Sequence, residues 1–506
     1  MATTTDRRAP GDAATRLVAW GLLAVTAMAF LLVSWGRLTG PFGDSDEGIN
    51  GAVWAYASRS MRDLGPVESA LGGRHLNGSR YATHPPLIVS ETALAETIAG
   101  EHGASSRAAA WVGSIVALFL LYRLGRRLGF SPVSAAGGAA VAGTTGMFVT
   151  YGPMLDTPVT AFPFAVGVTL LWTRDWQGDD PPSPWLTATV TLAACLASWQ
   201  CALLAGLAGA ALAVRHRRDP GRALLAAAPY LGGATAGVAL SIGWSWWTYG
   251  DLGALSDKLG RRTGSSSTVG LADVVSFQVP WLAELLGLGT LGLVGSVVAL
   301  WDRPVRPAAA LTLATAFGYA LLFREAAAGH QYWCYWVLLP VAIGSGWGLS
   351  RLERDVRARR GGTVAPVVGV VVAVVLVGAF DLARPGKAAG WISGGHQAVE
   401  LLRTGVPAEQ RVIHYVGEKD RPDPMVVYEL GRTAEALTMA ADLDALAAQR
   451  PDEPVYVVGV CGDGDAGVEL CRRVTTLVEG APTGEGPPPP RLVPAAELAE
   501  RLRTGG

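Results

Sequence analysis

Long apolar runs recur through residues 17–381, and compact clusters of arginine separate many of them. A helix that crosses a hydrocarbon core of about 30 Å needs roughly 20 predominantly apolar residues. The stretches 17–36 and 364–380 are clear examples of such runs. Together the runs predict about eleven transmembrane helices. We expect these helices at 17–37, 107–122, 132–150, 158–173, 184–198, 200–214, 223–248, 279–300, 308–323, 331–349 and 364–381.

The arginine clusters predict the orientation of the helices, because positively charged loops favour the cytoplasmic side. If every cluster is cytoplasmic, an even number of helices must separate one cluster from the next. The stretch 184–214 should then form two short helices that turn near Trp199-Gln200, since a single helix would put the RHRRDPGR segment outside. This topology describes a multi-pass protein of the plasma (cytoplasmic) membrane with its N-terminus inside. The segments expected outside are 39–106, 151–158, 249–278, 324–331 and the C-terminus.

The sequence changes character at about residue 384, where short alternating segments replace the long apolar runs. The elements expected there are two buried strands, at 411–417 and 454–460, and two amphipathic helices, at 441–449 and 495–503. The fold class is therefore a polytopic α-helical membrane domain, residues 1–383, with a small extracytoplasmic α/β domain, residues 384–506. Cys461 and Cys471 lie in the outer domain, where a disulfide and two free thiols fit the sequence equally well.

Composition agrees with a membrane protein and narrows the classes of partner. Half of the 506 residues are hydrophobic and only 16% are charged, which excludes an ordinary soluble domain. The net charge is −1 and no basic domain or stripe stands out, so nucleic acid is not an expected partner. Membrane lipid is the partner that this composition requires.

An acidic cluster follows the first transmembrane helix directly, with Asp44, Asp46 and Glu47 within four residues. Carboxylates at the end of a membrane helix are costly unless they are solvated, paired or used. A solvated turn is the ordinary explanation for such a trio. The next segment, 48–62, predicts an amphipathic helix that lies in the membrane interface.

A second group of polar residues lies on the same predicted side of the membrane. His84-Pro85-Pro86-Leu87 leads into a stretch that contains Glu91 and Glu96 and is too polar to span, so it predicts another interfacial helix. The turn Met154–Pro158 carries Asp156, which could simply cap the helix that follows. His330 and Tyr332 lie at an outer boundary where an aromatic belt is the default explanation.

The order of these motifs resembles the GT-C glycosyltransferases. The resemblance rests on the acidic pair Asp46-Glu47, the interfacial helix, the element His84–Leu87 and a helix that ends in LYRLGRRLG. The branch most similar contains protein O-mannosyltransferases and the aminoarabinose transferases that modify lipid A. Asp156 matches the second acidic site of this family. The likeness covers the first 175 residues well and the later helices by architecture.

The resemblance implies an inverting transfer of a sugar from a polyprenyl-phosphate donor to a hydroxyl acceptor at the outer face. A hydroxyl group is a poor nucleophile, so a carboxylate must take its proton as the new bond forms. Asp46 is the residue expected to act as this catalytic base. The acidic residues expected to support it are Asp44, Glu47 and Asp156.

The leaving group of this reaction is a lipid phosphate, which needs electrostatic support more than a proton. Lys258 directly precedes the Gly/Ser-rich segment LGRRTGSSSTVG, which carries two arginines and could close over the donor or simply be a solvated basic loop. His84 departs from the lysine that the family often has there, and a histidine is only partly charged near neutral pH. The residues expected to bind the donor phosphate or the acceptor are His84, Arg261, Arg262, Arg324, His330 and Tyr332.

A divalent metal cation is a further expected component, although some members of this class need none. Carboxylate oxygens and imidazole nitrogens can coordinate such a cation. The residues available for this purpose are Asp46, Glu47, Asp156 and His84.

Two other classes of function are compatible with a polytopic chain. A transporter of a polar or lipid-linked solute usually carries ionisable residues near the membrane midplane and internal repeats, and neither is evident here. A non-catalytic envelope scaffold would retain the architecture without depending on Asp46 or Asp156. Within the enzyme hypothesis, mannose-type and arabinose-type donors both fit. The acceptor could be a glycan, a protein or a small secreted molecule.

Overall fold

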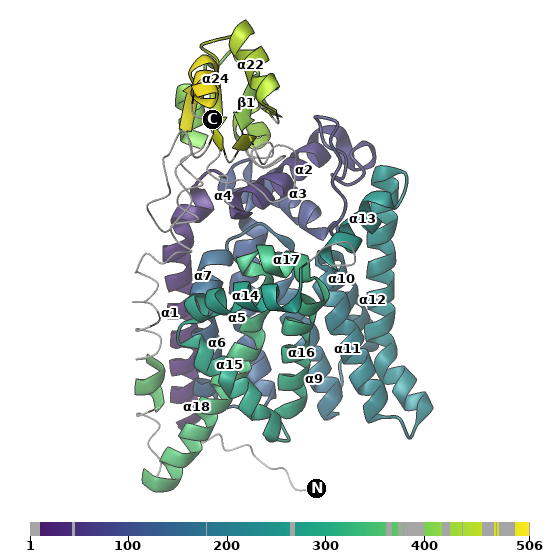
Figure 1. Ribbon diagram of the computed structural model, residues 1–506. Coiled ribbons are helices and arrows are strands. Elements are labelled where there is room, and N and C mark those ends of the chain that lie inside the picture. Colours follow the sequence, from purple (N-terminus) through teal and green to yellow (C-terminus); the bar gives the residue numbers. More distant parts are fainter. Residues whose placement is uncertain are drawn as a thin grey trace.

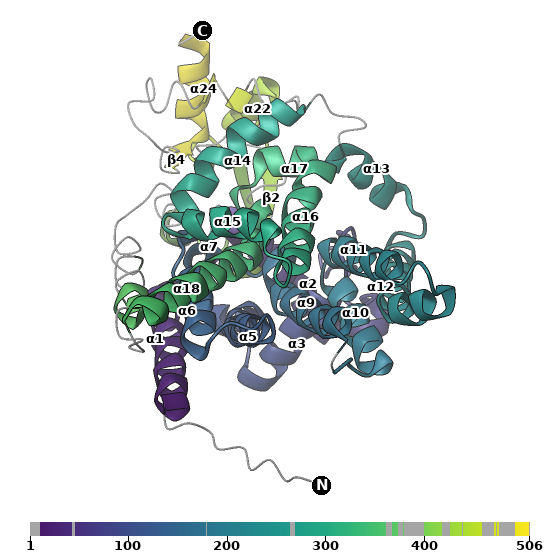
Figure 2. The same cartoon turned by 90° about the horizontal axis from the view of Figure 1, so that it is seen from below.

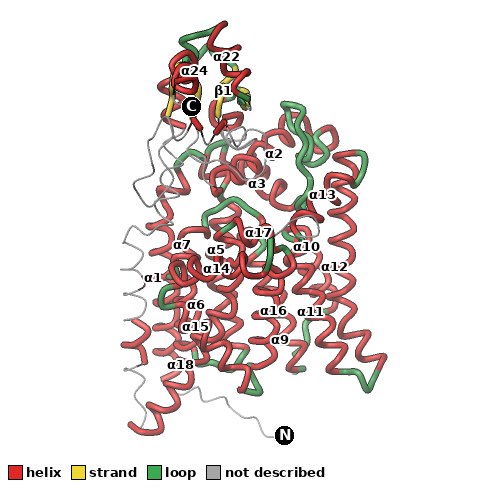
Figure 3. The backbone as a smooth tube through the Cα atoms, in the orientation of Figure 1, coloured by secondary structure: helices red, strands yellow, loops and turns green. Residues whose placement is uncertain are grey.

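The computed structural model describes residues 11–42, 46–178, 180–263, 269–360, 367–372, 378, 399–416, 426–437, 439–457, 470–471, 473–474 and 491–504. The chain forms a tall helical bundle, a layer of short helices across one end of the bundle, and a small α/β domain above that layer (Figure 1). We call this end the upper end. Figure 3 shows the strands gathered in the α/β domain, while the rest of the described chain is mostly helical.

Three of the described helices are long and apolar enough to cross a membrane, namely α1 (Gly11–Thr39), α5 (Ala108–Arg127) and α12 (Pro220–Tyr249). A bent pair, α14 (Leu271–Leu286) with α15 (Gly289–Val298) and the 3-10 turn η1 (Ala299–Trp301), raises this number to four if it counts as one span. By length and composition alone, the described helices therefore do not reproduce the predicted number of about eleven transmembrane helices. Most of the other apolar runs form short or interrupted helices.

The interruptions arise at residues that cap new helices. The run predicted at 132–150 is divided into α6 (Pro132–Gly143) and α7 (Gly146–Tyr151) where Thr145 accepts a hydrogen bond from the backbone of Phe148. The run predicted at 158–173 is likewise divided into α8 (Thr157–Thr160) and α9 (Phe162–Gln177). The remaining bundle helices are α10 (Pro184–Ala197), α11 (Trp199–Arg215), α16 (Arg306–Leu322), η2 (Gln331–Val337) and α18 (Leu338–Arg360).

Two predictions about this region have opposite outcomes. The expected turn between two short helices in 184–214 is confirmed, since α10 ends before Ser198 and the Ser198 side chain caps α11. The single helix expected at 279–300 is wrong. The chain bends by 112° between α14 and α15, and Gly287 at this break has φ +49°, which favours glycine.

The upper layer contains the two helices that the sequence predicts to be interfacial, α2 (Asp46–Glu68) and α3 (Leu87–Ala99). Three shorter helices accompany them, α4 (Gly103–Ser106), α13 (Gly253–Arg262) and α17 (Arg324–Gly329). In Figure 1, α2 and α3 lie between the bundle and the α/β domain, and α13 lies beside the upper end of α12. The basic segment that contains Lys258 is thus a helix up to Arg262 and not a loop, while residues 264–268 are not described.

The α/β domain confirms the expected strands and helices. Its sheet has the order β2-β1-β3-β4, in which β1 runs parallel to β2 and β3 and β4 runs antiparallel to β3. The elements are β1 (Val412–Val416), the π-helix η3 (Val426–Leu430), β2 (Thr433–Ala436), α22 (Ala440–Gln449), β3 (Pro454–Val457), β4 (Arg491–Pro494) and α24 (Ala495–Thr504). Cys471 is disulfide-bonded. Cys461 lies outside the described residues.

Close backbone contact between α15 and α18 holds the lower half of the bundle together, as the view in Figure 2 shows for these two adjacent helices. Small residues allow such an approach in membrane proteins. A methyl group added at Gly344 of α18 would overlap the carbonyl oxygen of Gly292 and the backbone nitrogen of Ser296. Gly348, one turn further along α18, has open space at the same position.

We therefore expect Gly344→Ala to lower the free energy of unfolding by about 1–3 kcal/mol or more, because the helices must move apart. Gly348→Ala should leave it nearly unchanged. Thermal unfolding of both variants in the same lipid nanodiscs measures the difference. Equal stability of the two variants would contradict this packing.

Candidate functional site

The buried carboxylate of Asp156 lies in the turn between α7 and α8, directly beneath α2. Its Oδ1 accepts hydrogen bonds from the Thr157 backbone (2.7 Å) and from Trp54 Nε1 (3.2 Å). Its Oδ2 accepts one from Asn50 Nδ2 (3.1 Å), and the same amide group donates to the Tyr332 hydroxyl (2.7 Å). Asp156 therefore caps α8, as the sequence allows, and also ties three separate parts of the chain together.

Burial and hydrogen bonding act on this carboxylate in opposite directions. Burial disfavours the charged form and raises the pKa of Asp156, while hydrogen bonds from Thr157 and Trp54 and the nearby His330 oppose the rise. The side chain is 7% exposed. A buried acid with this many partners is typical of a functional site, although structural networks can look the same.

The first turns of α2 lie against this carboxylate. Asn50 and Trp54 are four residues apart and both donate hydrogen bonds to Asp156, so one face of α2 lies against this carboxylate. Asp46 is the first residue of α2, four positions before Asn50 on the same face. The side chains of Asp46 and Glu47, and the whole of Asp44, lie outside the described residues. The role of Asp46 as base stays a prediction.

Beside Asp156 a cavity of about 290 Å³ opens at the upper end of the bundle. Most of its walls are apolar or aromatic, and its polar lining includes His84, Lys258 and Arg262. Its other lining residues are Thr83, Trp199, Val238, Ile242, Leu255, Leu259, Tyr319, Phe323 and Trp333. The Trp333 Nε1 group is buried and has no hydrogen-bond partner among the described residues.

Positive charge is concentrated at the polar part of this cavity. Burial lowers the pKa of His84 to about 3, and the charges of Lys258, Arg262 and His330 lower it as well. Burial lowers the pKa of Lys258 to about 8, and the neighbouring arginines contribute to this shift. Groups of one sign that depress each other's protonation favour an anionic ligand, which would relieve the repulsion.

Two acceptors partly balance Arg262. Its Nη1 lies 3.2 Å from Glu325 Oε2 and 3.2 Å from His330 Nε2. His330 stacks in turn on Tyr332, with ring centroids 5.4 Å apart. The cationic part of the cavity and the acidic site around Asp156 are therefore joined through the His330–Tyr332 pair.

A second connection runs through His84. Its ring lies 6.2 Å from that of Trp54, which donates to Asp156, and stacks on Tyr81 at 6.1 Å. At a pKa of about 3, His84 is neutral at physiological pH. The sequence suggested a partly charged histidine here, whereas the structure makes it a neutral hydrogen-bonding group between the two parts of the site.

The residues predicted from the sequence thus separate into two sets. Asp156, His84, Arg262, His330 and Tyr332 lie together, although they come from four distant parts of the chain. Arg261 is exposed, and neither it nor Arg324 lines the cavity.

Three residues of the site were not assigned to it from the sequence. Asn50 and Trp54 were assigned to the interfacial helix, and their positions four and eight residues after Asp46 are the signal that would have found them. Lys258 was assigned to a basic loop. Its position four residues before Arg262 places both on one face of α13.

The metal hypothesis can be examined only for two of its four residues. Asp156 already accepts three hydrogen bonds, and the charges around His84 repel a cation. Both observations disfavour a metal ion at this pair. Among the described residues no group of three or more His, Cys, Asp or Glu side chains could hold a metal ion. The side chains of Asp46 and Glu47 lie outside that set.

Comparison with known proteins finds one family match and several structures of similar fold. Residues 83–247 match the family described as dolichyl-phosphate-mannose-protein mannosyltransferase. No protein of curated function matches the sequence. The fold is similar to that of ArnT from Cupriavidus metallidurans bound to undecaprenyl phosphate, with a TM-score of 0.58, 14% identity and coverage of 85% of this chain and 88% of that chain.

Two further structures support the same fold. The apo form of the Cupriavidus metallidurans ArnT has a TM-score of 0.55 at 14% identity and covers 92% of each chain. The archaeal oligosaccharyltransferase AglB from Archaeoglobus fulgidus, in complex with an inhibitory peptide and a dolichol-phosphate, has a TM-score of 0.55 at 12% identity, covering 90% of this chain and 72% of that chain. The predicted resemblance to GT-C glycosyltransferases is confirmed, in sequence for residues 83–247 and in fold for most of the chain. Residues 83–247 thus match a glycosyltransferase family, and most of the chain shares the fold of ArnT and AglB.

The hydrogen bonds to Asp156 generate a prediction that needs no substrate. Trp54→Phe removes one donor to the charged form, so the pKa of Asp156 should rise further. Its carboxylate would then accept a proton at higher pH than in the parent protein. A pH titration of the carboxylic-acid infrared band, assigned with Asp156→Asn, measures this shift.

Trp111→Phe is the matched control, because the Trp111 indole donates to Ser34 and not to a carboxylate. It should leave the titration where it is. A Trp54→Phe band that titrates as in the parent protein would show that the indole does not support the charge.

Proposed function

We propose that the protein transfers a sugar from a polyprenyl-phosphate donor to a hydroxyl acceptor, with inversion, at the outer face of the membrane. The observation that carries this proposal is the arrangement of the cavity, whose cationic part adjoins the buried acidic site. A lipid-linked phosphate needs this combination of an apolar wall and a positively charged end. The bound undecaprenyl phosphate and dolichol-phosphate of the two similar structures give further support.

In the proposed reaction, two carboxylates and a set of cations have separate roles. The acceptor oxygen attacks the anomeric carbon while Asp46 takes the hydroxyl proton. The bond from that carbon to the phosphate oxygen breaks, and its electron pair stays on the lipid phosphate. Arg262 and Lys258 stabilise the resulting charge at the cavity.

The other residues of the site hold this arrangement in place. Asp156 accepts hydrogen bonds from Asn50 and Trp54 and so fixes the face of α2 on which Asp46 lies. Neutral His84 can donate a hydrogen bond to a phosphate oxygen without adding charge. Trp333 Nε1 is a further donor available at the wall of the cavity. No step of this reaction requires a metal ion, and activity that survives a chelator is the expected result.

The proposed orientation follows from the same chemistry. The N-terminus would be cytoplasmic, and the upper layer with the α/β domain would face outward, where the donor's sugar is accessible. The acceptor class stays open between a glycan, a protein and a small secreted molecule. Nothing in the described residues favours a transporter, whose ionisable groups usually lie near the membrane midplane.

Asp46→Asn is the direct test of the base. Transfer of radiolabelled sugar from purified mannosyl- and aminoarabinosyl-type polyprenyl phosphates should fall by about 10²- to 10⁴-fold, the usual contribution of a general base. Binding of the donor should persist, because the amide keeps the size of the side chain. A folded Asp46→Asn protein with full activity would remove Asp46 from this role. Solute uptake by proteoliposomes without any transfer product would instead support a transporter.

Lys258 gives the donor site a characteristic pH dependence. Its pKa, lowered to about 8, means that the ammonium group is charged below this pH and neutral above it. Affinity for a polyprenyl phosphate should therefore fall by roughly tenfold, about 1.4 kcal/mol, between pH 7 and pH 9. Equilibrium binding in detergent micelles across this range measures the change.

Lys258→Arg is the matched variant, because arginine keeps its charge throughout the range. Its affinity should stay nearly constant from pH 7 to pH 9. Parallel pH profiles in the parent protein and this variant would show that Lys258 does not face the phosphate.

A further inference from the structure

The segment that joins α1 to the acidic residues is held from below by Arg107. This arginine is fully buried, and its guanidinium donates to the carbonyl oxygens of Gly40 (2.8 Å) and Pro41 (3.3 Å). The same guanidinium lies 3.8 Å from the centre of the Phe42 ring. Three consecutive residues just before the acidic cluster therefore depend on one side chain of the membrane domain.

From above, the α/β domain holds the same segment. Glu429, in η3, accepts a hydrogen bond from the backbone nitrogen of Phe42 at 2.5 Å. The ring of Tyr428 packs edge-on against the Phe42 ring, with centroids 5.2 Å apart. The backbone amide of Phe42 thus has its partner in a residue that follows it by 387 positions.

Phe42 also contacts the helix that begins after the acidic cluster. Its ring is 0% exposed and lies so close to Gly51 of α2 that a methyl group there would overlap it. The residue before Gly51 is Asn50, which donates to Asp156. Phe42 and the Asn50–Asp156 hydrogen bond consequently both fix the first turns of α2.

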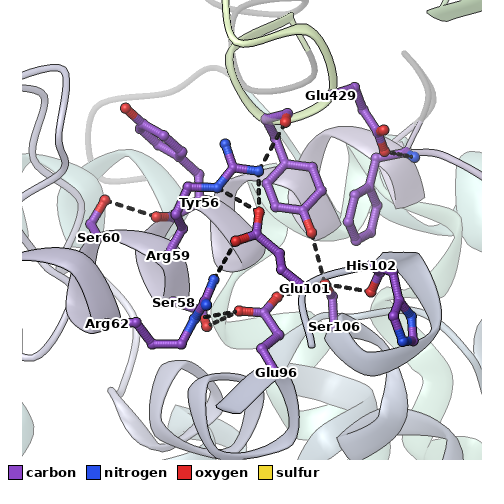
Figure 4. Close-up of polar contacts among 12 residues, drawn as sticks. Tyr56, Ser58, Arg59, Ser60, Arg62, Glu96, Glu101, His102, Ser106 and Glu429 are labelled. Carbon is purple, nitrogen blue, oxygen red and sulfur yellow. Dashed lines mark hydrogen bonds and ion pairs between the residues drawn. The ribbon is translucent and has the colours of Figure 1, made fainter. Parts of the chain in front are cut away.

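The surface on which η3 rests is a rigid network of charges (Figure 4). Arg59 and Arg62 of α2 both pair with Glu101, and Arg62 lies 3.2 Å from the buried Glu96. Arg59 also donates to the backbone oxygen of Tyr428 at 3.1 Å, with its guanidinium 4.5 Å from the Tyr428 ring.

Ser58 and Ser106 complete this network by hydrogen bonds to Glu96. Ser106 also meets the Tyr428 hydroxyl at 2.9 Å, so a single side chain of the α/β domain joins the network. The α/β domain is therefore anchored by specific polar contacts to the same helices that form the acidic site.

We propose that Tyr428 and Glu429 are positioning residues, which use the α/β domain to hold Phe42 against α2 and thereby set the N-terminal end of that helix, which begins at Asp46, for transfer. This proposal rests on the proposed role of Asp46. Loss of its acceptor leaves the buried Phe42 amide unsatisfied and favours a shift of this residue, and a displacement of about 1 Å can cost a reaction 10²-fold. The domain is then part of the catalytic unit and not only a surface for acceptors.

The test compares three full-length variants in lipid nanodiscs. Glu429→Ala removes the acceptor for Phe42, and Glu429→Gln keeps an oxygen that can accept the same hydrogen bond. Glu497→Ala is the control, because Glu497 lies in the same domain and pairs only with the exposed Arg501 among the described residues. The measurements are kcat and KM for the polyprenyl-phosphate sugar, and amide hydrogen exchange of peptides that cover residues 40–51.

We expect Glu429→Ala to lower kcat by roughly ten- to 100-fold, with donor KM within twofold of the parent value. Exchange over residues 40–51 should become faster in this variant only. Glu429→Gln should recover most of both properties, and Glu497→Ala should match the parent. A merely structural contact would instead reduce donor binding and thermal stability together with kcat.

Unchanged kcat and unchanged exchange in Glu429→Ala would overturn the proposal, as would a Glu429→Gln protein as impaired as Glu429→Ala. Failure of the proposed function looks different. If the parent protein transfers no sugar but hydrogen exchange is still faster in Glu429→Ala, the contact between Glu429 and Phe42 is supported. The chemistry assigned to that contact is then removed.

Discussion

The site depends on the hydrogen bonds that Asn50 and Trp54 of α2 donate to the buried carboxylate of Asp156. A buried charge is tolerated only when its hydrogen bonds are satisfied. Asp156 meets this condition with donors from α2 and from its own turn. The upper layer is thereby fixed to the bundle at the point where the predicted base enters α2.

The hydrogen bonds to Asp156 also explain how groups of opposite charge can lie in separate parts of the site. The buried carboxylate of Asp156 accepts hydrogen bonds from Asn50 and Trp54, whereas the basic groups Lys258 and Arg262 line the cavity. Neutral His84 lies between the two sets and adds no further repulsion. In the proposed reaction, removal of the acceptor proton and stabilisation of the departing phosphate are assigned to these separate groups.

The sequence predicts the layers of this fold better than the details of its helices. Charge parity and the order of motifs place Asp156, His84 and His330 at one end of the bundle, and the structure confirms that they meet. Hydropathy could not show the 112° bend between α14 and α15, because an apolar run has the same composition whether it is straight or broken.

Residues such as Asn50 and Lys258 become part of the site only through the direction of their helix faces, which depends on tertiary packing. The contact of Glu429 with Phe42 is beyond sequence reasoning altogether, since it joins two domains.

The central claim is that the cationic part of the cavity receives the phosphate of a lipid-linked sugar. A cryo-electron microscopy structure of the protein with a bound polyprenyl phosphate tests it most directly. Density for the phosphate is expected within hydrogen-bonding distance of Arg262 and His84, with the lipid chain along the apolar wall near Trp199 and Phe323. Phosphate density at another place, with this cavity closed or filled by protein side chains, would contradict the claim.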